Sequence, residues 1–273
     1  MKKQCEVAVI SNSNLEKYSF SKISSFHTCL VGFIFTYILK QEQVSNGMSE
    51  FGSFCHSLLE KWAKGELEIY ELLTEYENNY KDNVTSSFPR LRNGVDMGDA
   101  YYDDAYNFFS TFDGIGDYEI IGVEEHFEIQ IDDFIFNGFI DLILKDKDGN
   151  LIVFDWKSKK EFKDDEEEMK YRRQLYLYSY YLYEKHGKHP VSTIFYCFRK
   201  QKKYERKFDE KAYEESIKWM FDTVAEIRKL YCSYDYFFCS QLCSSRNICK
   251  MKKEVESNSN WKDIIKKQKK LEK

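Results

Sequence analysis

The sequence has no long apolar run and few prolines. Its longest apolar stretch, Leu30 to Leu39, falls short of the ~18 apolar residues of a membrane-spanning helix. The N-terminus lacks the order of basic, apolar and small residues that marks a secretory signal. We therefore expect a cytoplasmic protein without a membrane segment. With only 2 prolines in 273 residues and no long linker, the chain is also expected to form one compact body.

An excess of basic residues and a nucleotide-binding loop are absent too. The formal net charge is −5, which excludes a wholly basic nucleic-acid coat, so any DNA contact must come from a local patch. No Gly-x-x-x-x-Gly-Lys-Ser/Thr motif of nucleotide-binding proteins occurs. What the chain does contain is 42% apolar and 17% aromatic residues, enough for a sizeable core.

The most informative stretch is a predicted β-hairpin from Gly138 to Lys159, where two runs rich in Ile, Val, Leu and Phe flank a polar turn. If the turn is centred on Asp148, then Asp141 faces Asp155, and directly opposed side chains have Cβ atoms about 4.5–5.5 Å apart. Lys157 then shares their face, because strand side chains alternate with period two. A two-residue turn would instead put the two aspartates on opposite faces.

Two opposed carboxylates repel each other, and a divalent cation with oxygen ligands would stabilise them. A lysine beside that cation could hold or deprotonate a water molecule, or steady the charge of a phosphate. The alternative is an ordinary surface hairpin with charged ends. Gly-x-x-Asp at 138–141 followed by Asp-x-Lys at 155–157 resembles the PD-(D/E)xK nuclease superfamily, and specifically its RecB-like branch.

A histidine upstream extends this resemblance. Gly52 and His56 are four residues apart and share one face of a helix predicted over Ser49 to Ala63. Gly-x-x-x-His followed by Leu-Glu is similar to the first motif of the same branch, in which the histidine binds the metal. An imidazole among oxygen ligands suits Mn²⁺, and Mg²⁺ stays open. The metal ligands that the resemblance implies are His56, Asp141, Asp155 and the backbone carbonyl of Trp156, with Lys157 acting on the nucleophile.

A helix predicted over Lys170 to His186 carries a further motif. Gln174 and Tyr178 are similar to the Gln-x-x-x-Tyr pair that follows the catalytic lysine in RecB-like nucleases. The resemblance implies that the glutamine orients the active site and the tyrosine meets DNA. The alternative for Tyr178 is a tyrosine-rich packing stripe.

Other charged residues allow weaker expectations. The predicted strand Glu119 to Ile131 offers Glu124, Glu125 and Glu128, one of which could reach the metal, although a solvent-facing position is expected for each. Basic residues around and after the hairpin could form a strip that neutralises phosphates, or could simply be solvated. This predicted basic strip consists of Lys159, Lys160, Arg172, Arg173, Lys200, Lys202, Lys203 and Arg206.

Cysteines suggest a second cofactor, because in a reducing compartment the 8 cysteines are better explained as thiols or metal ligands than as disulfides. One cysteine near the N-terminus and a C-terminal cluster resemble the iron-sulfur motif of CRISPR-associated adaptation nucleases and of the AddB subunit. The implied ligands of a [4Fe–4S] cluster, or of zinc as the alternative, are Cys29, Cys239, Cys243 and Cys249. The sequence departs from this pattern at Leu30, where relatives have proline, and in the first gap of the cluster. Cys232 is therefore a spare candidate.

Together these patterns predict an α/β protein with a restriction-endonuclease-like core, a mixed central sheet flanked by helices. Its helical N- and C-terminal additions would be joined by the cysteine metal site. The expected segments of this one domain are N-terminal helices (17–65), a helical insertion (66–118), the catalytic core (119–200), a C-terminal helix with the cysteine cluster (209–249) and a polar tail (250–273).

The resemblance implies a metal-dependent DNA exonuclease acting on single-stranded or frayed ends, in recombination, repair, or phage or CRISPR DNA processing. A helicase, recombination or CRISPR protein would be its partner. The alternative is a DNA-binding or assembly module that keeps the fold without turnover.

Overall fold

The structure, a computed structural model, describes residues 15–42, 44–90 and 96–232. Its strands are β1 (Lys17–Ser19), β2 (Glu119–Ile131), β3 (Phe134–Lys145), β4 (Leu151–Lys157), β5 (Ser192–Cys197) and β6 (Lys202–Lys207). Its α-helices are α1 (Phe20–Thr28), α2 (Leu30–Phe33), α3 (Gly47–Ala63), α4 (Leu72–Asn83), α5 (Met97–Thr111), α6 (Asp165–His186) and α7 (Glu210–Cys232). Short helical turns of other types span Ile34–Ile38, Ile69–Glu71 and Phe198–Lys200.

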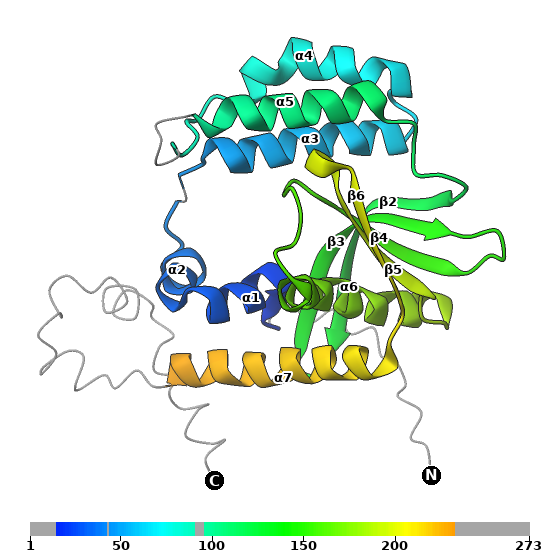
Figure 1. Ribbon diagram of the computed structural model, residues 1–273. Helices are drawn as coiled ribbons and strands as arrows, with labels where there is room; N and C mark the ends of the chain where they lie inside the picture. The colour runs from blue at the N-terminus through cyan, green and yellow to red at the C-terminus, as the bar shows by residue number, and fades with distance from the viewer. Residues whose placement is uncertain (1–14, 43, 91–95, 233–273) are drawn as a thin grey trace, which may run out of the picture.

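One mixed sheet lies between two groups of helices. Its strands run in the order β1-β3-β4-β5-β6, with β2 also paired to β3. The β1/β3 and β4/β5 pairs are parallel and the other pairs are antiparallel. Helices α3, α4 and α5 cover one face, and α1, α6 and α7 cover the other (Figure 1). The predicted α/β fold with a mixed sheet flanked by helices is therefore confirmed.

Alternation along β4 explains why both faces of the sheet are covered. Ile152, Phe154 and Trp156 join the core beneath α3, α4 and α5, whereas Leu151 and Val153 join the core beneath α6 and α7. A strand that is apolar on both faces is stable only when helices cover both of them. Asp155 and Lys157 continue the alternate positions of Leu151 and Val153. Because strand side chains alternate with period two, they face the side of α6.

The β3–β4 hairpin has the predicted register. Ile143 pairs with Val153 and Lys145 pairs with Leu151, as expected for a loop centred on Asp148. Asp146 holds that loop, because its Oδ1 accepts hydrogen bonds from the backbone amides of Asp148 and Asn150 at 2.9 and 2.8 Å. Gly149 completes the turn with a φ of 76°, which favours glycine.

Two boundaries differ from the sequence prediction. Helix α6 begins at Asp165 rather than at Lys170, because Asp164 caps it by accepting a hydrogen bond from the Glu167 amide at 2.8 Å. The acidic residues of the first turn then interact favourably with the positive end of the helix dipole. Residues 202–207, expected only as part of a basic strip, form β6, which pairs with β5 along its whole length.

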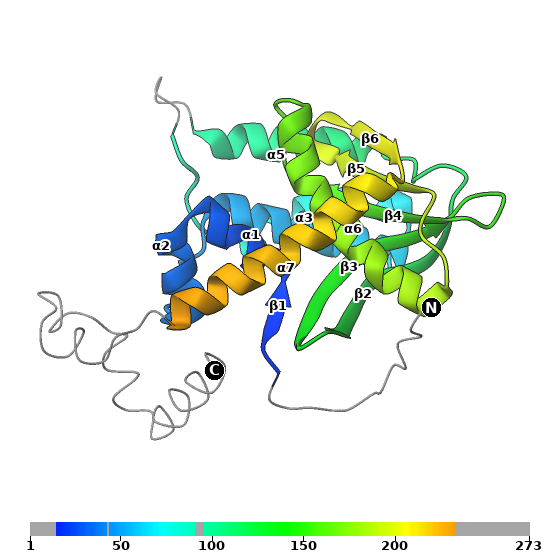
Figure 2. The same cartoon turned by 90° about the horizontal axis from the view of Figure 1, so that it is seen from below.

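Helices α1, α6 and α7 lie against one another on their side of the sheet (Figure 2). Ser19 caps α1 by accepting from the Lys22 amide at 3.2 Å, as one of two serines was expected to do. None of the helices within the described residues is both long and apolar enough to cross a membrane.

Candidate active site

Three potential metal ligands from three elements converge at one point of the fold. His56 comes from α3, Glu124 from β2 and Asp141 from β3, and one donor atom of each lies within 4.8 Å of the other two. His56 Nδ1 is 3.5 Å from Asp141 Oδ2. Helix α3 approaches this closely because residue 52 is glycine: a Cβ there would lie 3.2 Å from the Ser158 hydroxyl.

Glu124 reaches the site through an unusual backbone conformation. Its φ of 44° lies in the left-handed region, which is uncommon for a residue other than glycine and is often found at functional sites. A register irregularity in β2 lies just before it, between Ile120 and Gly122. The neighbouring pairs Val123–Leu142 and Glu125–Ile140 place Glu124 across from Asp141.

The other two glutamates of β2 have different partners. Glu125 pairs with Lys185 and accepts a hydrogen bond from the Tyr181 hydroxyl at 2.6 Å, and Glu128 pairs with Lys17. Glu124 was one of three glutamates that could reach the metal, but the sequence did not single it out, and a solvent-facing position was expected for each. The turn of residues 132–133, which pairs Ile131 with Phe134, fixes the β2 register and was the available signal.

Lys157 lies beside this group in a chain of polar contacts. Its ammonium is 2.7 Å from Asp155 Oδ2 and donates a hydrogen bond to Gln174 Oε1 at 3.0 Å. The Gln174 amide donates in turn to the Tyr178 hydroxyl at 2.8 Å. Asp155, Lys157, Gln174 and Tyr178 are therefore brought together as a connected set next to the possible metal ligands.

Tyr178 is buried, which favours the packing interpretation of its ring over direct contact with DNA. Its ring is 5% exposed and packs edge-on against Phe127. Gly138 makes room for the ring, because a Cβ at that position would lie 2.9 Å from Tyr178 Cε1. Tyr178 thus reaches the site only through its hydroxyl and Gln174.

Asp155 and Trp156 stand next to the donor group without being part of it. Asp155 is 3% exposed, and its Oδ2 receives no hydrogen bond although the Lys157 ammonium is close. The backbone amide of Trp156 donates to Asp141 Oδ2 at 2.8 Å, which ties the end of β4 to β3. A hydrogen bond with the Trp156 backbone raises the pKa of His56, against the larger lowering by burial. Metal binding by Asp155 and by the Trp156 carbonyl stays a prediction.

The electrostatics of the site favour a bound cation. Burial raises the pKa of Asp141 well above its ordinary value, and the nearby Asp155 raises it further. Burial also raises the pKa of Glu124, with Glu60 and Asp155 adding to the effect. Burial lowers the pKa of His56, which keeps the imidazole neutral and able to bind a metal. Two carboxylates and an imidazole fit a divalent ion such as Mg²⁺ or Mn²⁺.

The family model of the PD-(D/E)XK nuclease superfamily matches residues 17–250. The chain belongs to the PD-(D/E)XK nuclease superfamily. Members of this superfamily usually use divalent metals such as Mg²⁺, in agreement with the donor set described above. No curated protein matches the sequence.

Two solved structures are similar to this superfamily member over most of its length. A crystal structure of a candidate exonuclease from Eubacterium rectale aligns with a TM-score of 0.48 and 9% identity, covering 91% of this chain and 93% of that one. The structure of SSO0001 aligns with a TM-score of 0.25 and 14% identity, covering 83% of this chain and 96% of that one. Neither similarity bears on activity.

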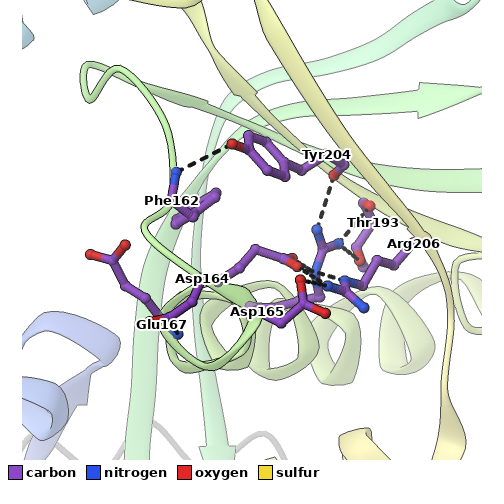
Figure 3. A network of polar contacts seen from close by, with 9 residues as sticks. Phe162, Asp164, Asp165, Glu167, Thr193, Tyr204 and Arg206 are labelled. Atoms are coloured by element: carbon purple, nitrogen blue, oxygen red, sulfur yellow. Dashed lines mark hydrogen bonds and ion pairs between the residues drawn. The ribbon is translucent and has the colours of Figure 1, made fainter.

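The predicted basic strip is not a free cationic surface in this PD-(D/E)XK protein. Arg172 is fully buried, where it pairs with Glu168 and donates to the carbonyl oxygens of Thr193 and Tyr204 at 2.7 and 2.9 Å (Figure 3). Arg206 pairs with the same Glu168. The lysines of the strip also have acidic partners. Lys159 pairs with Glu167, Lys160 with Asp104, Lys200 and Lys202 with Glu161, and Lys203 with Glu205.

The cysteine prediction falls mostly outside the described residues. Cys29 is an exposed free thiol at the start of α2, where its Sγ accepts a hydrogen bond from the Gly32 amide at 3.3 Å. Cys239, Cys243 and Cys249 lie outside the described residues. Cys232 is the last residue of α7.

Proposed function

We propose that the protein is a metal-dependent deoxyribonuclease that hydrolyses phosphodiester bonds from single-stranded or frayed DNA ends. The observation that carries the proposal is the convergence of donor atoms from His56, Glu124 and Asp141 within 4.8 Å of one another. The Lys157 ammonium, held between Asp155 and Gln174, stands beside them. Membership of the PD-(D/E)XK nuclease superfamily supports the same reaction class.

Each residue has a distinct part in the proposed reaction. His56, Glu124 and Asp141 would hold the divalent ion, with Asp155 and the Trp156 carbonyl next to them. The bound ion would supply a lowered water pKa and a counter-charge for the scissile phosphate. Lys157 orients or deprotonates the attacking water, and Gln174 fixes the direction of the Lys157 side chain. The Tyr178 hydroxyl holds Gln174 in turn.

The deciding experiment is the digestion of end-labelled single strands, blocked or free at each terminus, with Mn²⁺ and with EDTA. Activity on free ends with Mn²⁺ alone is expected. Lys157→Ala should abolish cleavage while leaving DNA binding intact, and Lys188→Ala serves as control because its ammonium donates to the Gly149 carbonyl in the hairpin turn. A Lys157→Ala protein that cuts at the normal rate would remove Lys157 from the mechanism. Activity on doubly blocked strands would make the enzyme an endonuclease.

The same assay separates this proposal from a DNA-binding or assembly module without turnover. Such a module would bind the labelled strand equally well with Mn²⁺ or EDTA and would leave it intact. Because the Lys157 ammonium of the Asp-x-Lys motif lies 2.7 Å from Asp155 and beside the possible metal ligands, we favour turnover. A helicase, recombination or CRISPR protein is proposed as partner, since the sequence contains no nucleotide-binding loop of the Gly-x-x-x-x-Gly-Lys-Ser/Thr type.

We also propose a [4Fe–4S] cluster held by Cys29, Cys239, Cys243 and Cys249, with zinc as the alternative. Cys29 fits this role because its thiol is free and exposed at a helix junction. Such a site would staple the N-terminal helices to the C-terminal part of the chain. Protein purified without air should be brown and contain iron, and Cys29→Ser should lose the colour. A colourless protein containing stoichiometric zinc would assign the site to zinc.

A further inference from the structure

A cavity of about 560 Å³ opens between α1, α6 and α7, on the same side of the sheet as Lys157. These helices lie side by side in both views of the molecule (Figures 1 and 2). Most of the side chains that line the cavity are aromatic or basic. They are Phe20 and His27 from α1, Lys170, Tyr171 and Arg173 from α6, and Trp219 from α7.

Flat groups dominate the wall of this cavity. The centroid of the Trp219 ring lies 6.1 Å from that of Phe20 and 5.8 Å from that of His27. The planes of Trp219 and His27 are tilted by 36°. The Arg173 guanidinium lies over the Trp219 ring at 5.0 Å. Tyr171 is 39% exposed although it belongs to a helix packed on the core. Exposed rings next to a guanidinium are the groups on which nucleic-acid bases stack without regard to sequence.

The cavity is connected to the proposed catalytic centre through Tyr171. This residue lies one helical turn before Gln174 on α6. The Lys157 ammonium is 5.8 Å from the Tyr171 ring, and the Lys159 ammonium is 4.8 Å from it. One face of Tyr171 therefore borders the candidate catalytic lysine while the residue also lines the cavity. A strand cut at the metal ligands would have a neighbouring nucleotide within reach of this wall.

Charge at the cavity suits a phosphodiester strand. Within the part of the chain that the structure describes, no carboxylate forms an ion pair with Arg173, whereas most other members of the basic strip are paired. The acid on the wall, Glu167, is compensated by Lys159 at 2.8 Å and by the Lys163 amide at 2.6 Å. Glu167 also extends away from the buried Arg172 network (Figure 3). The wall thus offers Arg173 to an anion, whereas the Lys170 ammonium is paired with Glu166 at 2.7 Å.

We propose that this cavity is a subsite for one nucleotide of the single-stranded DNA substrate, next to the nucleotide being cleaved. The base stacks on the aromatic wall formed by Trp219 and Tyr171, and Arg173 contacts a phosphate. This inference rests on the proposed function, because it identifies what the strand contacts beyond the metal ligands. It also explains how a chain of net charge −5 could hold a strand without a basic coat.

The test is equilibrium binding of a short fluorescent oligothymidylate, measured by anisotropy in EDTA so that no cleavage occurs. We expect Arg173→Gln and Trp219→Ala each to weaken binding by about tenfold. The logarithmic salt dependence should also become shallower by about 0.7 in Arg173→Gln, the value for one phosphate contact on a single strand. Lys218→Gln is the control, because it removes one positive charge beside Trp219 on an exposed pair with Asp222.

A second probe separates stacking from phosphate contact. An abasic oligonucleotide of the same length should bind wild type more weakly than oligothymidylate, and this preference should be lost in Trp219→Ala but kept in Arg173→Gln. Trp219→Phe, which keeps a ring in the packed position, should keep most of the preference. If Trp219→Ala fails to fold, Arg173→Gln and the comparison of the two oligonucleotides on wild type still decide the matter. Unchanged affinity in Arg173→Gln together with no preference in wild type would overturn the subsite.

The outcomes distinguish this inference from the proposed function. Wild-type affinity in both Arg173→Gln and Trp219→Ala, with cleavage intact, would overturn the subsite and leave the nuclease proposal standing. If wild type never cleaves DNA but both variants bind it more weakly than wild type does, the subsite is supported and the nuclease proposal is removed. If Lys218→Gln lost as much oligothymidylate affinity as Arg173→Gln, the effect would come from overall charge, and the subsite would be overturned.

Discussion

At the scale of single residues, the position of Glu124 is the most specific feature of the site. Its left-handed backbone aims a carboxylate at His56 and Asp141, whereas Glu128 on the same strand pairs with Lys17. We expect Glu124→Gln to lower Mn²⁺ affinity and DNA cleavage by about 100-fold, at the upper end of the range for residues around a metal. Glu128→Gln should leave both unchanged. Calorimetric titration with Mn²⁺ and the end-label assay measure the effect, and equal losses in the two variants would argue against Glu124 as a ligand.

Asp141 predicts a pH dependence whose sign follows from its burial. Because the pKa of Asp141 is raised in the folded protein, the folded state binds the proton more tightly than the unfolded state does. Metal-free protein should therefore lose stability as the pH rises from the ordinary pKa of an aspartate to the raised value, and the penalty should persist above it. Asp141→Asn should thus raise the melting temperature in EDTA at neutral pH, and by less in acid.

Bound metal should reverse the order of stability of wild type and Asp141→Asn. Wild type should gain stability from Mn²⁺ at neutral pH, whereas Asp141→Asn should gain little, because it lacks the carboxylate that the cation needs. Thermal unfolding with EDTA and with Mn²⁺ at two pH values gives all four comparisons. A less stable Asp141→Asn in EDTA at neutral pH would contradict the assigned pKa direction.

At the scale of elements, α6 contacts the candidate catalytic lysine through a relay of two side chains. Gln174 accepts a hydrogen bond from the Lys157 ammonium, and the Tyr178 hydroxyl accepts one from the Gln174 amide. A neutral hydrogen bond is worth about 1 kcal/mol, so Tyr178→Phe should slow cleavage by about fivefold. Gln174→Ala should slow it more, and Tyr178→Phe should add nothing to Gln174→Ala. Single-turnover rates measure this cycle, and additive losses would show that Tyr178 acts independently of Gln174.

The N-terminal half of α6 is joined to β5 and β6 by buried charges. Arg172 is fully buried against Glu168 and lies 5.1 Å from the Phe195 ring, which is itself 5.0 Å from the Lys157 ammonium. Arg172→Ala should cost about 3 kcal/mol of unfolding free energy, the lower end of the range for a broken buried pair. It leaves buried Glu168 with Arg206 as its remaining described partner and removes the donor to the Thr193 and Tyr204 carbonyls. Urea unfolding measures this loss. Arg172→Met combined with Glu168→Leu should recover most of it, and no recovery would show that the polar network itself is required.

Elements differ in how far the sequence predicts them. The hairpin register followed from an odd loop held by Asp146 and Gly149, because its determinants are local. The strand β6 was missed, since the charged segment from Lys202 to Lys207 pairs with β5 only through tertiary contacts. Similarly, the spacing of Asp141, Asp155 and Lys157 was visible, but the entry of Glu124 depends on how β2 pairs with β3.

At the scale of the whole molecule, the candidate site lies where a helix from one covering group meets the sheet. His56 belongs to α3, whereas Glu124 and Asp141 belong to β2 and β3. A cation bound by all three would therefore connect two layers that otherwise meet mainly through apolar contacts. Such a cation should stabilise the whole fold and not only the hairpin.

This connection predicts a large effect of metal on unfolding. At a free Mn²⁺ concentration a hundredfold above its dissociation constant, the gain is about 2.7 kcal/mol, or roughly 5–10 °C in melting temperature for a chain of this size. His56→Ala should lose most of that gain, because it removes the ligand that α3 contributes. His126→Ala is the matched control, since its ring packs on Phe139 on the outside of the sheet. If His56→Ala gained as much as wild type, the ion would be held by the sheet alone, and α3 would have no part in the metal centre.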